Sequence, residues 1–187
     1  MIVVVSGLPR SGTSLLMQML AAGGMPVLTD QVRAPDTDNP RGYFEWEPAK
    51  LLPRQPQLIR EAEGKAVKIV SSLLWALPPG HDYRVLFMER PLIEVAASQV
   101  AMIRRRGACP SLEGRALIAA LDAHRRQALA HLKERGFACC VVRYHDVLAA
   151  PGQEAVRIAQ FLGLELDCEA MARQADPTLY RQRLSHP

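Results

Sequence analysis

The feature that most limits the possible folds is a short apolar run that leads directly into a glycine-containing loop. Residues 2–5 read Ile-Val-Val-Val, which is typical of a strand buried on both faces. Gly7 to Gly12 form the loop, and residues 14–22 have the pattern of a helix that stops at two glycines. A strand, a glycine loop and a helix in this order predict a parallel α/β sheet.

The rest of the chain continues this alternation of strands and helices. Further strands are expected at 66–70, 84–88 and 137–143, and further helices at 91–105, 111–135, 151–163 and 167–183. Ser111 is the expected cap of the helix that it begins. The segment 29–65 is rich in proline and charge, which predicts a long loop and then a broken helix. A loop of this length in a compact domain is usually functional.

The size and composition of the chain suit one domain. It has 187 residues, of which 49% are hydrophobic, enough for a full core. We therefore predict a single P-loop-type α/β domain over residues 1–187. Its three layers would be a mostly parallel sheet of roughly four to five strands and helices on both faces.

The loop from Gly7 to Ser14 has the spacing G-x-x-x-x-G-x-S and the chemistry of a phosphate-binding turn. Glycines let the backbone amides approach an anion, and the following helix directs its free N–H groups at the same point. Thr13 and Ser14 add hydroxyl donors, and Arg10 adds a cation. The sequence therefore predicts binding of a phosphorylated nucleotide or a close analogue. The alternative is a glycine turn without a ligand.

The same loop departs from the pattern of an ATPase. A Walker A loop has lysine immediately before its final serine or threonine, whereas this chain has Thr13 there. The third strand ends at Glu89 beside Arg90, which is not a clean Walker B aspartate. Transfer of an ATP γ-phosphate thus lacks two of its usual parts.

Composition limits the other classes of function. The net charge is +4, but aromatic residues make up only 5% and no basic stripe is visible, so nucleic-acid binding is not expected. The four cysteines form no CxxC pair, so we expect reduced, buried thiols and no metal site. No signal peptide or membrane span is visible, which predicts a cytoplasmic protein.

Three segments in order resemble sulfotransferases that use phosphoadenosine phosphosulfate (PAPS). Residues 9–14, Pro-Arg-Ser-Gly-Thr-Ser, resemble the family's phosphosulfate loop, and residues 85–98 resemble its second nucleotide segment. Residues 143–148, with Pro151 and then 161–164, resemble its R-Y-E-D-L … P … F-L-G-L region. His145 stands where that last motif has an acid.

The resemblance implies PAPS as cofactor, adenosine 3′,5′-bisphosphate (PAP) as product, and no required metal. It assigns the phosphosulfate to the loop residues Pro9, Arg10, Ser11, Gly12, Thr13 and Ser14. Arg10 would stabilise the leaving oxygen, and Arg90 and Ser98 would bind the ribose 3′-phosphate. PAPS needs two separate anion sites, and a guanidinium suits the second as a bidentate donor. The alternatives are a structural ion pair for Arg90 and a helix-surface position for Ser98.

The catalytic base is expected in the long loop. Residues 38–47 resemble the N-P-x-G-Y-x-E segment of bacterial family members, where the glutamate lies by the acceptor. Glu45 is the first candidate and Glu47 the second, because a carboxylate among aromatic side chains suits base catalysis. The alternative is a loop carboxylate that pairs with Arg41 or Lys50.

Lys68 is the third catalytic candidate. It lies in the apolar run of the second strand. Facing inward, it would reach the transferred group, whereas facing outward it would be a solvated lysine with a buried stem.

The reaction implied is metal-independent, in-line transfer of a sulfuryl group to a hydroxyl or amine. The acceptor would be a small molecule or a carrier-bound group, with residues 29–65 on its side of the domain. A homodimer is one way in which so short a chain would complete the pocket. The alternatives are a P-loop small-molecule kinase and a non-catalytic nucleotide-binding protein.

Overall fold

The computed structural model describes residues 1–30 and 42–179 of the chain. Within them five strands form one sheet in the order β2-β3-β1-β4-β5. All four neighbouring pairs are parallel. The strands are β1 (Ile2–Gly7), β2 (Val27–Leu28), β3 (Ala66–Lys68), β4 (Tyr83–Glu89) and β5 (Ala138–Arg143).

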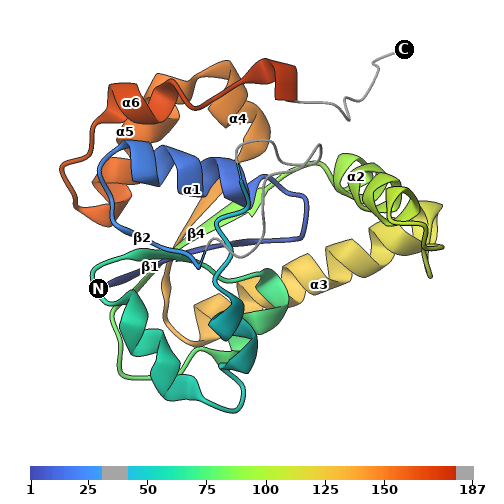
Figure 1. Cartoon of the computed structure of the whole chain (residues 1–187), viewed down its shortest axis with the longest axis horizontal. Helices are drawn as coiled ribbons and strands as arrows, with labels where there is room; N and C mark the ends of the chain where they lie inside the picture. The colour runs from blue at the N-terminus through green and yellow to red at the C-terminus, as the bar shows by residue number, and fades with distance from the viewer. Residues whose placement is uncertain (31–41, 180–187) are drawn as a thin grey trace.

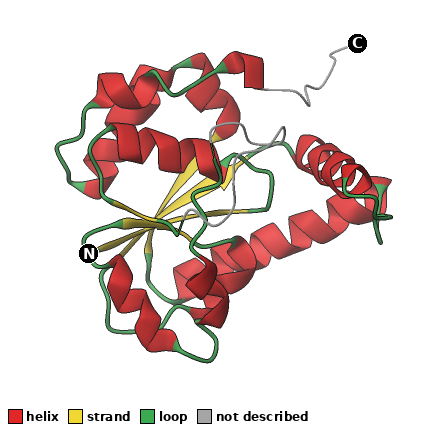
Figure 2. Cartoon of the chain, viewed as in Figure 1, coloured by secondary structure: helices red, strands yellow, loops and turns green. Residues whose placement is uncertain are grey.

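Helices lie on both sides of the sheet, which gives the domain three layers (Figures 1 and 2). The α-helices are α1 (Thr13–Ala22), α2 (Leu92–Arg105), α3 (Gly114–Glu134), α4 (Tyr144–Ala149), α5 (Pro151–Leu162) and α6 (Cys168–Ala172). The 3-10 helices are η1 (Glu47–Leu51), η2 (Pro56–Ala62), η3 (Ser71–Ala76) and η4 (Pro177–Leu179). In Figure 1, α1, α5 and α6 lie on one side of the sheet and α3 on the other.

The β-branched run of β1 explains this arrangement. Val3 and Val5 pack into a core cluster with residues of α1, α5 and α6, whereas Ile2 and Val4 pack into a second cluster with η1, η2, η3 and α3. All four side chains are fully buried. Alternate residues of a strand point to opposite faces, so this run supplies both cores at once. Burying each such side chain contributes about 1.5–3 kcal/mol before entropy is counted.

The expected fold class is confirmed: one α/β sheet, parallel, with helices on both faces. The first strand, the first helix and the helix that begins at Pro151 match their expected positions within about two residues, an ordinary boundary error. β2 was not expected, because two residues are too few to show a period.

Four other expectations need correction. The helix expected from Ser111 begins instead at Gly114, where Glu113 before it is paired with Arg104 at 2.8 Å. The strand expected to reach residue 70 ends at Lys68. The broken helix expected before Gly64 is the pair of 3-10 helices η1 and η2. The helix expected from 167 is the five-residue α6 followed by η4, and residues 180–183 lie outside the described part of the chain.

The cysteines are also only partly as expected. All four are free thiols, but Cys140 alone is buried, while Cys109 and Cys139 are exposed and Cys168 is intermediate. Burial raises the pKa of the Cys140 thiol, which keeps it protonated.

Candidate functional site

The carboxyl ends of the central strands bring the candidate residues to one edge of the sheet. β1 ends at Gly7, β3 beside it ends at Lys68, and β4 on its other side ends at Glu89. The chain leaves β1 between these two neighbours, so this is the point where the strand order reverses. Ligands of open α/β sheets bind at such points, outside the carboxyl ends of the strands.

At two positions of the phosphate loop, neighbouring atoms leave no room for a side chain, so glycine is required. A Cβ at Gly7 would lie 2.6 Å from Ser11 Oγ and 2.7 Å from the carbonyl oxygen of Met88. Gly12 has a φ of 109°, and a Cβ there would lie 2.5 Å from the ring of Tyr144. A side chain at either position would displace the loop or its support. The glycine spacing in the sequence is therefore set by packing as well as by the turn.

The loop holds buried polar groups that suit an anion. Ser11 is 1% exposed, and its hydroxyl has no hydrogen-bond partner among the described residues. The same is true of Ser6 at the end of β1. Gly12 precedes the first turn of α1, whose N–H groups have no acceptor within the helix. A buried unsatisfied polar group costs about 1–3 kcal/mol, so a bound phosphate or phosphosulfate would stabilise this loop.

Arg10 links the loop to α2. Its φ of 74° places this non-glycine residue in the left-handed region. Arg10 Nε donates to Ser98 Oγ at 3.0 Å. Next to Arg10, the carbonyl of Pro9 accepts from Gln99 Nε2 at 2.9 Å. The structure thus brings together Arg10 and Ser98, which the sequence assigned to different phosphates.

Arg90 is buried in a small network at the end of β4. Its Nε donates to Glu94 Oε2 at 2.8 Å, and its guanidinium lies 4.9 Å from the centre of the Tyr144 ring. Glu94 also lies 3.2 Å from His145 Nε2. The structural ion pair considered for Arg90 is present.

Lys68 faces inward, which decides between its two expected orientations. It is 7% exposed, and its Nζ lies 3.4 Å from Ser14 Oγ of the phosphate loop. The same Nζ donates to the carbonyl of Tyr43 and lies 3.9 Å from Glu45 Oε1. Ser14 Oγ also donates to the Tyr43 carbonyl at 3.3 Å. Lys68 therefore joins the phosphate loop to the segment that follows residue 41.

The two candidate bases have different surroundings. Glu45 lies beside Lys68, and its own carbonyl is fixed by Thr29 Oγ1 at 3.0 Å. Glu47 instead pairs with Lys50 at 2.6 Å, and both side chains are exposed. The hydrogen bond to Glu47 raises the pKa of Lys50. The pairing considered for these loop carboxylates thus applies to Glu47 and Lys50. Arg41 lies outside the described residues.

Two residues of the site were missed by the sequence reasoning. Tyr144 begins α4 and packs its ring between Gly12 and Arg90, and burial raises its phenol pKa. Its sequence neighbours gave no sign of this, because both contacts are long-range. Glu94 could have been found, since residues four apart at a helix start can face each other and Arg90 lies two residues before α2.

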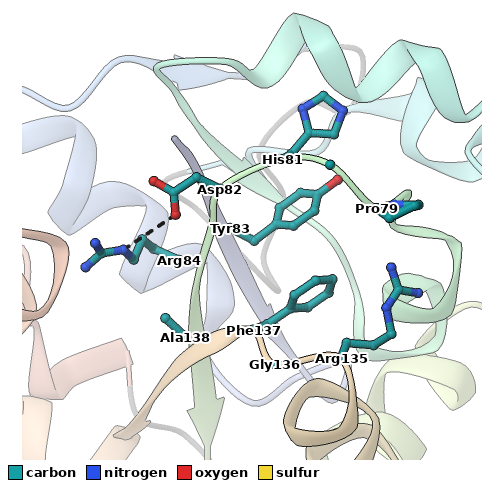
Figure 3. Close-up of a pocket in the computed structure, with 10 residues that line it drawn as sticks. Pro79, His81, Asp82, Tyr83, Arg84, Arg135, Gly136, Phe137 and Ala138 are labelled. Atoms are coloured by element: carbon teal, nitrogen blue, oxygen red, sulfur yellow. Dashed lines mark ion pairs between the residues drawn. The ribbon is translucent and has the colours of Figure 1, made fainter.

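A separate pocket of about 560 Å³ lies at the opposite, amino edge of β4 and β5 (Figure 3). It is lined by residues 79–84 and 135–138. His81 there pairs with Glu63 at 2.7 Å, and the Tyr83 and Phe137 rings lie 4.9 Å apart. Burial raises the pKa of Tyr83 to about 12, so its hydroxyl stays neutral. This pocket lies a strand length away from the phosphate loop.

No helix in the described ranges is long and apolar enough to cross a membrane. Within residues 1–30 and 42–179, no three His, Cys, Asp or Glu side chains are grouped closely enough to hold a metal ion.

Comparison with known proteins identifies the fold. No protein-family model and no curated protein matches the sequence. Among solved structures, a mouse sulfotransferase, SULT7A1, complexed with PAP superposes with a TM-score of 0.56 at 16% identity, over 95% of this chain and 64% of that one. The sulfotransferase domain of the curacin biosynthetic pathway gives a TM-score of 0.55 at 17% identity, over 100% of this chain and 92% of that one. Sulfotransferase STF9 from Mycobacterium avium gives 0.56 at 16% identity, over 92% and 66%.

The chain therefore has the sulfotransferase fold, as its three sequence segments implied. It spans about two thirds or less of the mouse and mycobacterial proteins but nearly all of the curacin domain. At this level of identity the likeness concerns the fold.

Proposed function

We propose that this protein is a PAPS-dependent sulfotransferase that transfers a sulfuryl group to a hydroxyl or amine. The observation that carries the proposal is that two groups suited to bind anions lie at the same edge of the sheet. One is the glycine loop with its buried Ser11 hydroxyl, and the other is the buried guanidinium of Arg90. A donor with a 5′-phosphosulfate and a 3′-phosphate needs both, whereas ATP needs only the first.

The residues would divide the binding as follows. The amides at the start of α1 and the hydroxyls of Ser11, Thr13 and Ser14 would hold the 5′-phosphosulfate. Arg90 and Ser98, which lies on α2, would hold the 3′-phosphate. The bound cofactor supplies the sulfuryl group and a phosphate leaving group.

Catalysis would rest on fixed positive charge. Charge builds on the leaving oxygen during in-line transfer, and preorganised donors at that point lower the barrier. Arg10 lies in the loop and contacts Ser98 of α2, and Lys68 contacts the Ser14 end of the loop. These two cations would flank the departing group. A guanidinium stays charged near neutral pH, so Arg10 would act by electrostatics and not as a proton donor.

Glu45 would be the base for the acceptor. Its carboxylate is partly exposed and lies 3.9 Å from Lys68 Nζ, beside the phosphate loop. A base must lie within hydrogen-bond reach of the acceptor proton while the acceptor oxygen faces the sulfur. Glu45 meets this requirement better than Glu47, which is bound to Lys50 at the surface.

The acceptor side of the site, the oligomeric state and the cellular location are also part of the proposal. Residues 29–30 and 42–65 would lie on the acceptor side, whereas residues 31–41 of this expected region lie outside the described part of the chain. The acceptor would be a small molecule or a group on a carrier, with a dimer as one way to close the pocket. The curacin domain shows that a chain of nearly this length can have the sulfotransferase fold. We further propose that the protein acts in the cytoplasm and without nucleic acid as a partner.

The proposal is tested by transfer of radiolabelled sulfate from PAPS to a panel of alcohols, phenols and amines. Turnover should occur without added Mg²⁺. Arg10→Ala should reduce it by about 10²–10³-fold, the usual loss when one charge-stabilising donor is removed. Undiminished turnover in this variant would remove Arg10 from the mechanism, and turnover with Mg-ATP in place of PAPS would indicate a kinase.

A further inference from the structure

The carboxylate of Glu94 is shared by two side chains at the second anion site. Arg90 Nε donates to its Oε2 at 2.8 Å, and His145 Nε2 lies 3.2 Å from its Oε1. The Glu94 side chain is 1% exposed, whereas the imidazole of His145 is 44% exposed. One buried anion therefore connects a buried guanidinium with an imidazole that protons from solvent can reach.

The charge of this trio depends on the imidazole. With neutral His145, the charges of Arg90 and Glu94 cancel. With protonated His145, the three groups sum to one positive charge. A phosphate monoester carries one to two negative charges near neutral pH, so it is held more strongly by the protonated trio.

We propose that His145 tunes the affinity of the Arg90 site for a 3′-phosphate through its protonation. The inference rests on the proposed function, because it takes the 3′-phosphate to bind at Arg90. His145 is then a positioning residue that acts through Glu94. When His145 is protonated, its charge offsets the negative charge of Glu94, so that the positive charge of Arg90 attracts the ligand more strongly. Affinity for PAP should rise as pH falls, because a proton gained by His145 adds a positive charge to the trio.

Other charged groups of the described residues lie near this trio. On α4, Asp146 lies next to His145 and 3.9 Å from Arg143. Asp176 and Arg10 are close enough to act on the neighbouring phenol of Tyr144. Burial raises the pKa of Tyr144 from its ordinary 10.0, so that phenol stays neutral.

The sequence difference at this position fits the same argument. The motif that residues 143–148 resemble has an acid where this chain has His145. An acid there would place a second negative charge against buried Glu94, which would raise the cost of burying both. A histidine instead gives Glu94 a donor, and one whose charge changes near physiological pH.

The test is calorimetric titration of the full chain with PAP and with ADP between pH 5.5 and 8, comparing the unmodified protein with His145→Gln. The phosphate of PAP itself titrates near pH 6. For each ligand we therefore compare the affinity of the unmodified protein with that of His145→Gln at the same pH, and the titration of the ligand cancels in this ratio. Between pH 8 and 5.5, the ratio of the two proteins' affinities for PAP should change by about fivefold or more. Fivefold is the low end of typical coupling between two sites. The ratio for ADP should stay constant.

His81→Gln is the matched control. His81 also pairs with a glutamate, Glu63, but at the amino edge of the sheet (Figure 3). This variant should have the same pH dependence of PAP binding as the unmodified protein. A second readout follows from reciprocity: bound PAP should shift the NMR titration of the His145 ring to higher pH.

The outcomes are distinct. If the unmodified protein and His145→Gln bind PAP with parallel pH dependence, or if the variant weakens PAP and ADP equally at every pH, the inference is wrong and His145 is only structural. If PAP binds no better than ADP to the unmodified protein at any pH, the proposed function itself fails, and the inference fails with it.

Discussion

The two edges of the sheet carry similar side chains in different surroundings. At the carboxyl edge, Arg90 and Glu94 form an ion pair whose side chains are 9% and 1% exposed. At the amino edge, His81 and Glu63 form a pair whose side chains are 17% and 45% exposed. The carboxyl edge adds a glycine loop with a buried serine hydroxyl that has no partner in the described part of the chain. The difference shows that arginines, histidines and acids do not mark a site by themselves; buried charges beside unsatisfied donors do.

The largest predicted effect is that of Gly12→Ala at the carboxyl edge, for which Gly80 at the amino edge is the matched comparison. Gly12 and Gly80 have φ values of 109° and 90°, so alanine strains the backbone at both, by about 1–2 kcal/mol. Only at Gly12 would the new Cβ strike a neighbour, Tyr144; at Gly80 nothing lies within 4 Å. Gly12→Ala should weaken PAP binding by about 100-fold or more, because a displaced loop would lose two or more hydrogen bonds to the phosphate, each contributing about 1.5–3 kcal/mol. Titration calorimetry with PAP checks this.

Gly80→Ala serves as the control for that strain. It should lower the midpoint of thermal unfolding while leaving PAP affinity unchanged. Comparable losses of affinity in both variants would mean that general destabilisation, and not the shape of the phosphate loop, controls binding.

The second prediction compares the two candidate bases, Glu45 and Glu47, in their effect on sulfuryl transfer. Glu45→Gln should reduce sulfuryl transfer by about 100-fold, the low end of the contribution of a general base, with little change in PAP affinity. Glu47→Gln removes a surface pair with Lys50 and should have little effect. Steady-state kinetics on an acceptor found in the panel measures both. A large loss in Glu47→Gln alone would make Glu47 the base.

The third prediction compares Arg90 at the carboxyl edge with Arg84 at the amino edge in their effect on PAP and ADP binding. Arg90→Gln should weaken PAP binding by about 10- to 100-fold relative to ADP, as expected when a charged donor to phosphate is lost. Arg84→Gln at the amino edge removes a hydrogen bond to the Phe161 carbonyl and should leave both affinities unchanged. The ratio of the PAP and ADP dissociation constants is the measurement. An equal loss for both ligands in Arg90→Gln would rule out a 3′-phosphate role.

The smallest effect concerns stability at the amino edge. The hydrogen bond from His81 is the largest cause that lowers the pKa of Glu63 below its ordinary 4.5. A carboxyl whose pKa is lower in the folded state stabilises the fold above about pH 4.5, and this contribution disappears as pH falls through the folded-state value. The pair is exposed, so the effect should be below about 1 kcal/mol. Urea unfolding of Glu63→Gln should show a flatter acid limb between pH 5 and 3, with PAP binding unchanged.

The sequence predicted what is local and missed what depends on distant contacts. The strand, the glycine loop and α1 are continuous in the chain, and their glycines and apolar residues show this unit directly. The Arg10–Ser98 hydrogen bond joins residues 88 positions apart, and no period or motif predicts it. α4 is only six residues long, too short for a helical period to show.

The candidate catalytic residues show the same limit. Lys68 was placed in a strand by its apolar neighbours, but the face to which it points depends on the pairing of β3 with β1, where Lys68 lies opposite Val5. A shift of one residue in this register would have turned it outward. The difference between Glu45 and Glu47 likewise depends on tertiary contacts, namely those with Lys68 and Lys50.

The central claim, that this edge of the sheet holds two anion sites for a 3′-phosphorylated nucleotide, is tested most directly by one titration. Calorimetry should compare PAP, ADP and ATP, each with and without Mg²⁺, on the unmodified chain. The account predicts that PAP binds more tightly than ADP by at least about tenfold, with no dependence on the metal. Preferential binding of Mg-ATP, or equal affinity for PAP and ADP, would contradict it.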